Sequence, residues 1–253
     1  AVVAFDVTDA ADPSGLPRVW IRDRTAGTTT PVAELVSAAP GISGNGCLVA
    51  YSAPSGANSD PTVSLRVVDR CATSSGEPLP AGTVVDTVPA VPTSTPPAAP
   101  VDEYAAPALS FDGSTIVWST GSEIRRYVRT ALITGGLAAG EVVADHLLVD
   151  SFDVELVPSA AMTGADVDIS DDGTAVVFVA GPGSVPFAPA PGNVYVWRQS
   201  GAPADPTIEL LSRTTSGEPG AASSASPAMS ADGSLVVFDS TSTDLAAIGT
   251  GPV

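Results

Sequence analysis

The stretch S-P-A-M-S-A-D-G-S-L-V-V-F, Ser226 to Phe238, has three close copies earlier in the same chain. They are A-P-G-I-S-G-N-G-C-L-V-A-Y (Ala39–Tyr51), A-P-A-L-S-F-D-G-S-T-I-V-W (Ala106–Trp118) and D-V-D-I-S-D-D-G-T-A-V-V-F (Asp166–Phe178). Each copy has Ser three positions before a shared Gly, Asn or Asp directly before it, and an aromatic residue five positions after it. The glycines are 67, 60 and 60 residues apart. Repeats of this period indicate an array or a propeller.

Each copy predicts a tight turn followed by a buried strand. Asn-Gly or Asp-Gly between two apolar runs is typical of a hairpin turn, because these residues tolerate positive φ. The Ser and Asp side chains can accept hydrogen bonds from turn amides. The turn residues are Ser43, Asn45, Gly46, Ser110, Asp112, Gly113, Ser170, Asp172, Gly173, Ser230, Asp232 and Gly233.

Two further strands are expected in each unit. The third strands are predicted over 18–24, 64–70, 123–129 and 193–199, and the weaker fourth strands over 30–37, 82–88, 153–159 and 207–213. In the third unit an insertion, Leu132–Asp150, precedes the predicted fourth strand. Four antiparallel strands in a unit of this size are a propeller blade, so the predicted fold class is an all-β propeller of four-stranded antiparallel blades.

The repeat divides residues 1–253 into units of about 1–38, 39–104, 105–164, 165–225 and a partial 226–253, within a single domain. Phe5 takes the place of the repeated aromatic residue, so the first unit lacks its turn and innermost strand. The last unit contains only two inner strands. We therefore expect about four and a half blades, as part of a larger ring; the alternative is a ring that is closed in an unusual way.

The motif P-x-[ILM]-S-x-[DN]-G, followed by an apolar strand ending in an aromatic residue, resembles the TolB-like propeller repeat. R-V-W-I-R-D-R-T-A-G-T-T-T (Arg18–Thr30) looks like the third strand and turn of secreted actinobacterial members. The resemblance covers nearly the whole chain and implies six blades. It implies little about function, because relatives serve as protein-docking platforms, as substrate-gating domains of peptidases or as surface proteins.

Composition excludes some classes of function. The chain of 253 residues is 44% hydrophobic and 15% charged, with 24 Gly and 24 Pro, which suits short strands joined by turns. Its net charge is −18 and all ten basic residues are Arg. Such a surface repels phosphate backbones, so we expect no nucleic-acid partner. No apolar run approaches the ~18 residues of a membrane span, so membrane insertion is not expected either.

The two cysteines predict a disulfide. Cys47 begins the second strand of its unit and Cys71 follows the third. If residue 53 opposes residue 65 in this hairpin, residue 47 opposes residue 71, which is close enough for a bridge. The alternative is two unrelated buried thiols. A bridge implies an oxidising compartment, so the expected location is extracellular or at the cell surface.

No catalytic residue is predicted. His146 is the only histidine and stands apart from any nucleophile motif. No zinc-binding, paired-cysteine or phosphate-loop pattern occurs, so no cofactor is expected. Two acidic clusters could hold calcium, although solvated turns explain them better. These clusters are Asp6, Asp9 and Asp12, and Asp166, Asp168, Asp171 and Asp172.

Loops that differ between units are the expected contact regions. They include a Pro-rich stretch, Val88–Pro100, which resembles O-glycosylated segments, and the loop Gly181–Gly192. Phe187 in that loop is the candidate partner contact, or it tucks against its own blade. The leading prediction is a non-enzymatic secreted or surface module that binds a protein or glycan, or self-assembles. The alternative is the propeller portion of a larger enzyme, such as a gate over a peptidase domain.

Overall fold

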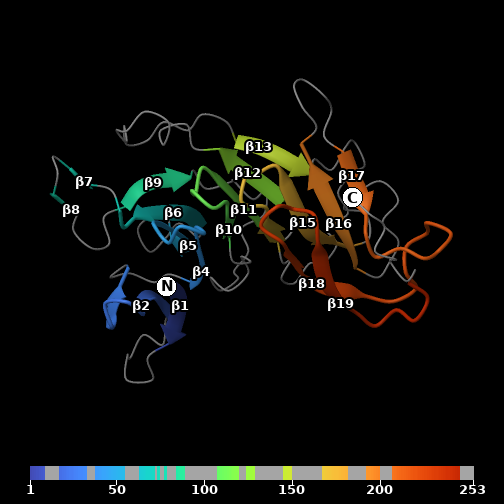
Figure 1. Ribbon diagram of the computed structural model, residues 1–253, viewed down its shortest axis with the longest axis horizontal. Coiled ribbons are helices and arrows are strands. Elements are labelled where there is room, and N and C mark those ends of the chain that lie inside the picture. Colours follow the sequence, from blue (N-terminus) through green and yellow to red (C-terminus); the bar gives the residue numbers. More distant parts are fainter. Residues whose placement is uncertain are drawn as a thin grey trace.

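The computed structural model describes residues 1–8, 17–32, 38–54, 63–71, 73–74, 77–78, 84–88, 107–119, 124–128, 145–149, 167–181, 192–199 and 207–245. These residues form antiparallel strands that group into five main sheets, which we call blades 1 to 5 in chain order. The blades follow one another around an arc, from β1 and β2 past β6 and β12 to β18 and β19 (Figure 1). Within the described part of the chain, no helix is long and apolar enough to cross a membrane.

Each blade keeps the strand order of the chain. Blade 1 contains β1 (Val2–Thr8), β2 (Pro17–Asp23) and β3 (Thr28–Pro31). Blade 2 contains β4 (Ala38–Ile42), β5 (Leu48–Pro54), β6 (Val63–Asp69) and β9 (Val84–Val88), with a small hairpin of β7 (Thr73–Ser74) and β8 (Glu77–Pro78) beside it. Blade 3 contains β10 (Ala108–Leu109), β11 (Thr115–Ser119), β12 (Ile124–Val128) and β13 (Asp145–Val149). Blade 4 contains β14 (Val167–Ile169), β15 (Ala175–Ala180), β16 (Asn193–Arg198) and β17 (Thr207–Leu210), and blade 5 contains β18 (Ser224–Met229) and β19 (Val236–Ser240).

The outer strand of blade 3 differs from the prediction. The sequence favours 153–159, after an insertion, but β13 pairs with β12 over Asp145–Val149, inside that insertion. The run D-H-L-L-V supplies apolar residues eight positions earlier in the chain, which makes the connection from β12 slightly less costly to close. Residues 153–159 themselves lie outside the described part.

In the described part of the chain, three apolar cores lie between neighbouring blades. Side chains of the second strand point alternately to the two faces of the sheet. Residues two and four positions after the repeated glycine face the next blade. Residues three and five positions after it face the preceding blade. Val2 and Ala4 of blade 1 thus pack with Val49 and Tyr51 of blade 2. The same pattern joins blade 2 to blade 3 and blade 3 to blade 4. The repeated aromatic residue is therefore an inter-blade core residue.

At the two ends of the arc these positions are uncovered. Leu235, just before β19, and Val237 of β19 are 61% and 58% exposed, whereas their equivalents Ala175 and Val177 in β15 are buried. Val3 of β1 is 46% exposed, although the equivalent Val49 is fully buried. Among the described residues, each terminal blade therefore presents a face that an internal blade would pack against a neighbour.

Candidate functional site

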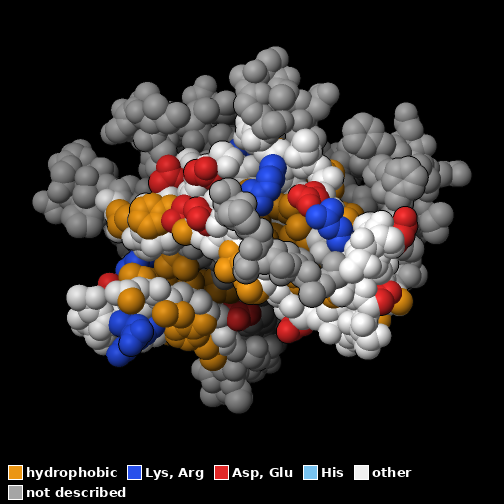
Figure 2. All heavy atoms as spheres, turned by 45° about the vertical axis from the view of Figure 1, so that its right-hand side comes forward, with side chains coloured by type: hydrophobic (Ala, Val, Ile, Leu, Met, Phe, Trp, Pro, Cys, Tyr) orange, Lys and Arg blue, Asp and Glu red, His pale blue; other side chains and the backbone are white. Residues whose placement is uncertain are grey.

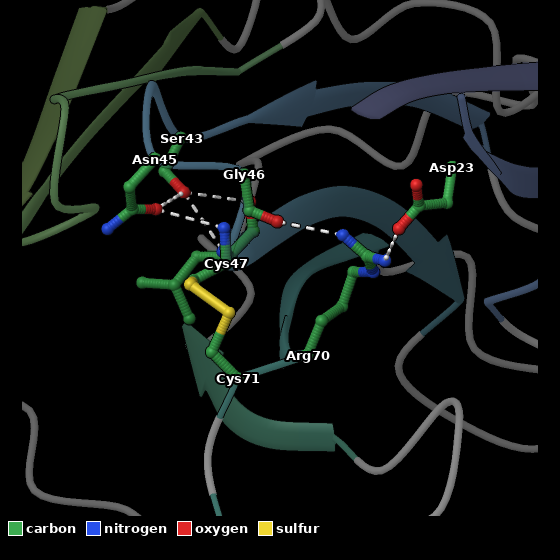
Figure 3. The surroundings of a disulfide bond; sticks show 8 residues. Asp23, Ser43, Asn45, Gly46, Cys47, Arg70 and Cys71 are labelled. Carbon is green, nitrogen blue, oxygen red and sulfur yellow. Dashed lines mark hydrogen bonds and ion pairs between the residues drawn. A yellow bond between two sulfur atoms is a disulfide. The ribbon is translucent and has the colours of Figure 1, made fainter. Parts of the chain in front are cut away.

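The repeated turn is a closed network of hydrogen bonds, seen for blade 2 in Figure 3. The Ser43 hydroxyl donates to Oδ1 of Asn45 at 2.7 Å and accepts from the amide of Leu48 at 2.9 Å. Oδ1 of Asn45 also accepts from the amide of Cys47 at 2.9 Å. Gly46 has φ of 76° and donates its amide to the Ser43 carbonyl. Positive φ closes this turn, which explains the glycine.

The other three turns repeat this geometry, as the sequence predicts. Gly113, Gly173 and Gly233 have φ between 70° and 73°. In each turn the serine hydroxyl accepts from the amide five residues later, at 2.9 to 3.0 Å. The serine also donates to the aspartate carboxylate, at 2.6 to 3.1 Å. The serine and aspartate or asparagine side chains of the repeat thus form hydrogen bonds within their own turns.

Backbone hydrogen bonds join the four turns to one another. The amide of Asn45 donates to the carbonyl of Phe111, the amide of Phe111 to the carbonyl of Asp171, and the amide of Asp171 to the carbonyl of Ala231, at 2.7 to 2.9 Å. We call this row of turns, residues 43–46, 110–113, 170–173 and 230–233, the turn arc. The turn arc is a continuous, rigid surface at one end of the blades.

The turn arc carries one exposed aromatic side chain among carboxylates. Phe111 is 49% exposed and its ring lies beside Gly44, where a Cβ would come within 2.6 Å of the ring carbon Cδ2. The equivalent positions in the other turns are Gly44, Asp171 and Ala231. Phe111 is therefore the only large apolar group at this position among the described turns.

The carboxylates of the turn arc are held in their charged form. The hydrogen bond from Ser170, with that from the Thr174 amide, lowers the pKa of Asp172. The hydrogen bond from Ser230 and that from the Ser234 amide lower the pKa of Asp232 to about 2. For Asp112, burial raises the pKa, but hydrogen bonds from Ser114 and Ser110 outweigh it, so that the pKa is lowered. Donated hydrogen bonds favour the ionised carboxylate.

Arginines of the third strands donate hydrogen bonds to the carbonyls of the turn glycines. Arg126 of β12 and Arg198 of β16 donate to the carbonyls of Gly173 and Gly233 in the next blade, at 3.2 and 2.8 Å. The Arg126 guanidinium also lies 5.3 Å from the centre of the Trp197 ring, and burial lowers its pKa. Nε of Arg126 is buried without a hydrogen-bond partner among the described residues. These arginines act as links between blades.

In blade 2 the arginine link takes a different form (Figure 3). Arg70 donates to the carbonyl of Gly46 in its own blade at 2.9 Å, and its guanidinium lies 3.6 Å from the Asp23 carboxylate of blade 1. Hydrogen bonds from the amides of Ala26 and Thr25, with a smaller contribution from Arg70, lower the pKa of Asp23. Sequence reasoning missed all of these arginines, because nothing in the repeat shows which arginine reaches a neighbouring turn.

The predicted disulfide between Cys47 and Cys71 is present, with Cα atoms 5.1 Å apart. The register that led to it is wrong by one residue. Leu48 opposes Asp69, and the amide of Arg70 donates to the carbonyl of Cys47, so Cys47 lies opposite Arg70. Cys71 reaches Cys47 diagonally from just beyond the strand. The bridge fastens the turn of blade 2 directly to the end of β6.

The remaining predicted sites fall largely outside the described part of the chain, so they stay predictions. Phe187, Asp9, Asp12 and Asp166 lie outside the described residues, as does the side chain of His146. Asp168 accepts from the amide of Met229 at 2.8 Å and so joins blade 4 to blade 5. Within the described ranges, no three His, Cys, Asp or Glu residues gather as a metal site would require.

Comparison with known proteins supports the architecture. No family model and no curated protein matches the sequence. Among solved structures, the β-propeller domain of the trilobed protease from Pyrococcus furiosus matches with a TM-score of 0.53 and 9% identity over 94% of this chain. The chain has a β-propeller fold.

Two further similar structures are more distant in shape. A protein of Agrobacterium tumefaciens described as TolB matches with a TM-score of 0.45 and 18% identity, over 83% of this chain and 60% of its own. A periplasmic gluconolactonase of Pseudomonas aeruginosa matches with a TM-score of 0.41 and 15% identity, over 89% of this chain and 58% of its own. The match covers 61% of the length of the Pyrococcus propeller domain. This chain therefore spans less than two thirds of the length of each of the three similar structures.

Proposed function

We propose that this propeller is a non-enzymatic binding module that works in an oxidising, extracytoplasmic compartment, with the turn arc as its contact face. The observation that carries the proposal is the position of Phe111. Its backbone is fixed by hydrogen bonds to turns on both sides, while half of its side chain is open to solvent. A rigid, exposed aromatic residue is a common anchor for a sugar ring or for an apolar side chain of a protein.

The surroundings of Phe111 indicate the kind of partner. The ionised carboxylates of Asp112 and Asp172, and the exposed Asp171, lie on the same turn arc. An aromatic ring among carboxylates favours ligands with hydroxyl or cationic groups that can also stack, as sugars and basic peptide segments do. The disulfide supports the compartment, because such bridges persist where thiols are not kept reduced.

Catalysis is not part of the proposal. In the described residues, the repeated Ser and Asp side chains bond to each other and to turn amides, and burial of Ser43, Ser110 and Ser170 removes their hydroxyls from solvent. The alternative is a propeller that gates a larger enzyme. It is retained because the similar Pyrococcus structure is the propeller domain of a protease.

The test compares two surface variants of the purified chain. Phe111→Ser should abolish binding on glycan and peptide arrays, whereas Ile208→Ser, which alters an apolar side chain exposed to a similar extent on β17, should leave it unchanged. Equal binding by Phe111→Ser and the unaltered chain would reject the turn arc as the contact face. Hydrolysis of any peptide or lactone by the unaltered chain would reject the non-enzymatic class. Figure 2 shows why the control matters, since hydrophobic side chains reach the surface beside charged ones in several places on the face that it draws.

A further inference from the structure

Asn45 departs from the aspartate that the other three repeated turns have at this position. It stands directly before Gly46. The equivalent residues are Asp112, Asp172 and Asp232. A glycine after an asparagine leaves its own backbone nitrogen open to approach, because it carries no side chain. That nitrogen can attack the side-chain amide carbon of the asparagine and close a five-membered ring, which is the first step of deamidation.

The side-chain amide of Asn45 is held through its oxygen alone (Figure 3). Oδ1 accepts from the Ser43 hydroxyl at 2.7 Å and from the amide of Cys47 at 2.9 Å. Nδ2 has no hydrogen bond to another described residue and points away from this network, and Asn45 is exposed. The two donors stabilise the negative charge that develops on Oδ1 when the amide carbon is attacked. The nitrogen that must leave is already directed to solvent.

The aspartate turns are protected from the equivalent reaction. Hydrogen bonds from serine hydroxyls and turn amides lower the pKa of Asp172, and they lower the pKa of Asp232 to about 2. Both carboxylates are therefore ionised near neutral pH. An ionised carboxylate repels the electron pair of a backbone nitrogen, whereas an amide carries no charge. The same pattern of hydrogen bonds thus leaves Asn45 as the reactive residue of the four turns.

The product of deamidation fits the turn without rearrangement. In blade 4, Oδ1 of Asp172 accepts from the Ser170 hydroxyl at 2.7 Å and from the amide two residues later at 3.0 Å. These are the two hydrogen bonds that Oδ1 of Asn45 accepts. An oxygen in place of Nδ2 therefore alters an atom that the turn does not use. Isoaspartate would instead add a carbon to the backbone and shift the Gly46 carbonyl, which accepts from Arg70 at 2.9 Å.

We propose that Asn45 is a site of spontaneous deamidation, which converts the turn of blade 2 to the S-x-D-G form of the other turns. The Gly46 nitrogen gives its proton to water or hydroxide, and its electron pair forms a bond to Cγ of Asn45. The bond from Cγ to Nδ2 breaks, and ammonia leaves with a proton to give a succinimide. Water then breaks the new bond between Cγ and the Gly46 nitrogen, which restores the peptide N–H and leaves a carboxylate. The net reaction consumes water, releases ammonium and needs no oxidant or reductant.

The modification changes the charge of the turn arc. The amide of residue 45 donates to the carbonyl of Phe111, so the new carboxylate lies next to the residue that we propose as an anchor. The chemistry itself does not depend on the proposed binding function, because it requires only Asn45, Gly46 and water.

The first experiment follows the purified chain in mildly alkaline buffer. The Gly46 amide donates to the Ser43 carbonyl at 2.8 Å, and this bond must open before attack. We therefore expect an acidic form that accumulates more slowly than in the urea-unfolded chain, with aspartate as its main product at position 45. Asn193 is the internal control, because it is fully buried and is followed by the β-branched Val194, and it should stay an amide.

Three outcomes of this experiment would overturn the proposal. Asn45 could remain an amide in the folded chain after the unfolded chain is fully converted. Peptide mapping could place the new acid at another asparagine. Isoaspartate could be the main product in the folded chain.

Variants supply the matched controls. Asn45→Asp should migrate with the acidic form in isoelectric focusing and have a Tm within about 2 °C of the unaltered chain. Asn45→Gln, whose longer side chain would have to close a six-membered ring, should give no acidic form. Asp172→Asn places an Asn-Gly pair in the turn of blade 4 and should create a second site there. A larger loss of Tm in Asn45→Asp, an acidic form from Asn45→Gln, or no second site in Asp172→Asn would each contradict the assignment.

Discussion

A Cβ placed on Gly113 would lie 2.3 Å from Cδ1 of Leu48, across the boundary between blades 3 and 2. The turn glycine is therefore required twice, once for its positive φ and once because the preceding blade leaves no room for a side chain. Gly173 repeats the relationship, with Thr115 Oγ1 at 2.6 Å and Thr115 Cβ at 2.9 Å from the added atom.

The two requirements can be separated by mutation. Gly113→Ala should lower the free energy of unfolding by about 2–4 kcal/mol, since backbone strain and a forced shift of Leu48 add together. Gly217→Ala is the matched control, because Gly217 has φ of 86° but nothing within 4 Å of an added Cβ. It should cost about 1 kcal/mol, from strain alone. Equal midpoints in urea denaturation would contradict the inter-blade contact.

Serine in an internal turn should matter more than serine in the last turn. Ser170→Ala leaves the buried amide of Ala175 without its acceptor, which should cost about 1–3 kcal/mol. Ser230→Ala removes the same hydrogen bond to Leu235 in blade 5, where water can replace it, and should cost less than about 1 kcal/mol. Thermal unfolding of the two variants side by side measures the difference.

The disulfide should stabilise blade 2 measurably. Its cysteines are 24 residues apart, so replacing both in a Cys47→Ser, Cys71→Ser variant should lower the free energy of unfolding by about 3 kcal/mol. Reduction should bring the unaltered chain to the stability of the variant and leave the variant unchanged. Recovery of both residues as free thiols by non-reducing mass mapping of the chain produced in an oxidising compartment would contradict the bridge.

Acid should weaken the turns through their aspartates. Folding lowers the pKa of Asp232 from 3.8 to about 2, so its contribution is present above about pH 4 and is lost as the pH falls through about 2. Asp112 and Asp172 are shifted in the same direction. Replacing all three by Asn, the residue that blade 2 already uses at position 45, should make the loss of stability between these pH values shallower. Urea denaturation across this range provides the comparison, and an unchanged slope would exclude the aspartates as its cause.

The exposed end of the arc can be tested by truncation of equivalent leucines. Leu48→Ala removes a buried side chain between blades 2 and 3 and should cost about 2–5 kcal/mol. Leu235→Ala alters the same repeat position in blade 5, where the side chain is exposed, and should change stability by less than about 0.5 kcal/mol. A large loss at Leu235 would mean that another surface covers it in solution.

Much of the blade could be predicted because its signals are local. The alternation of the second strands, the Asp-Gly or Asn-Gly turns and the positive φ of their glycines depend on residues within a few positions of one another. The third strands were also placed within one or two residues, for example β16 at Asn193–Arg198 against the predicted 193–199. Local hydrogen bonding and burial fix these elements.

What sequence reasoning missed depends on contacts between distant residues. The outer strand of blade 3 was misplaced, because several apolar runs compete for an edge and only pairing with β12 decides between them. The link from Arg198 to Gly233 spans 35 residues and leaves no mark on the repeat. Ala39 and Ser226 adopt positive φ at bulges before a proline, which the usual preferences of these residues do not indicate.

The glycine that accommodates the side chain of the preceding blade also bears on how such a chain can evolve. Leu48, Thr115 and Ala175 differ in shape, yet each meets the same small residue on the following unit. At this one contact, a duplicated unit would meet a residue small enough to accept its side chain. Gain or loss of whole units would leave this contact intact, and the equal spacing of 60 residues between the last three glycines is a spacing that such events preserve.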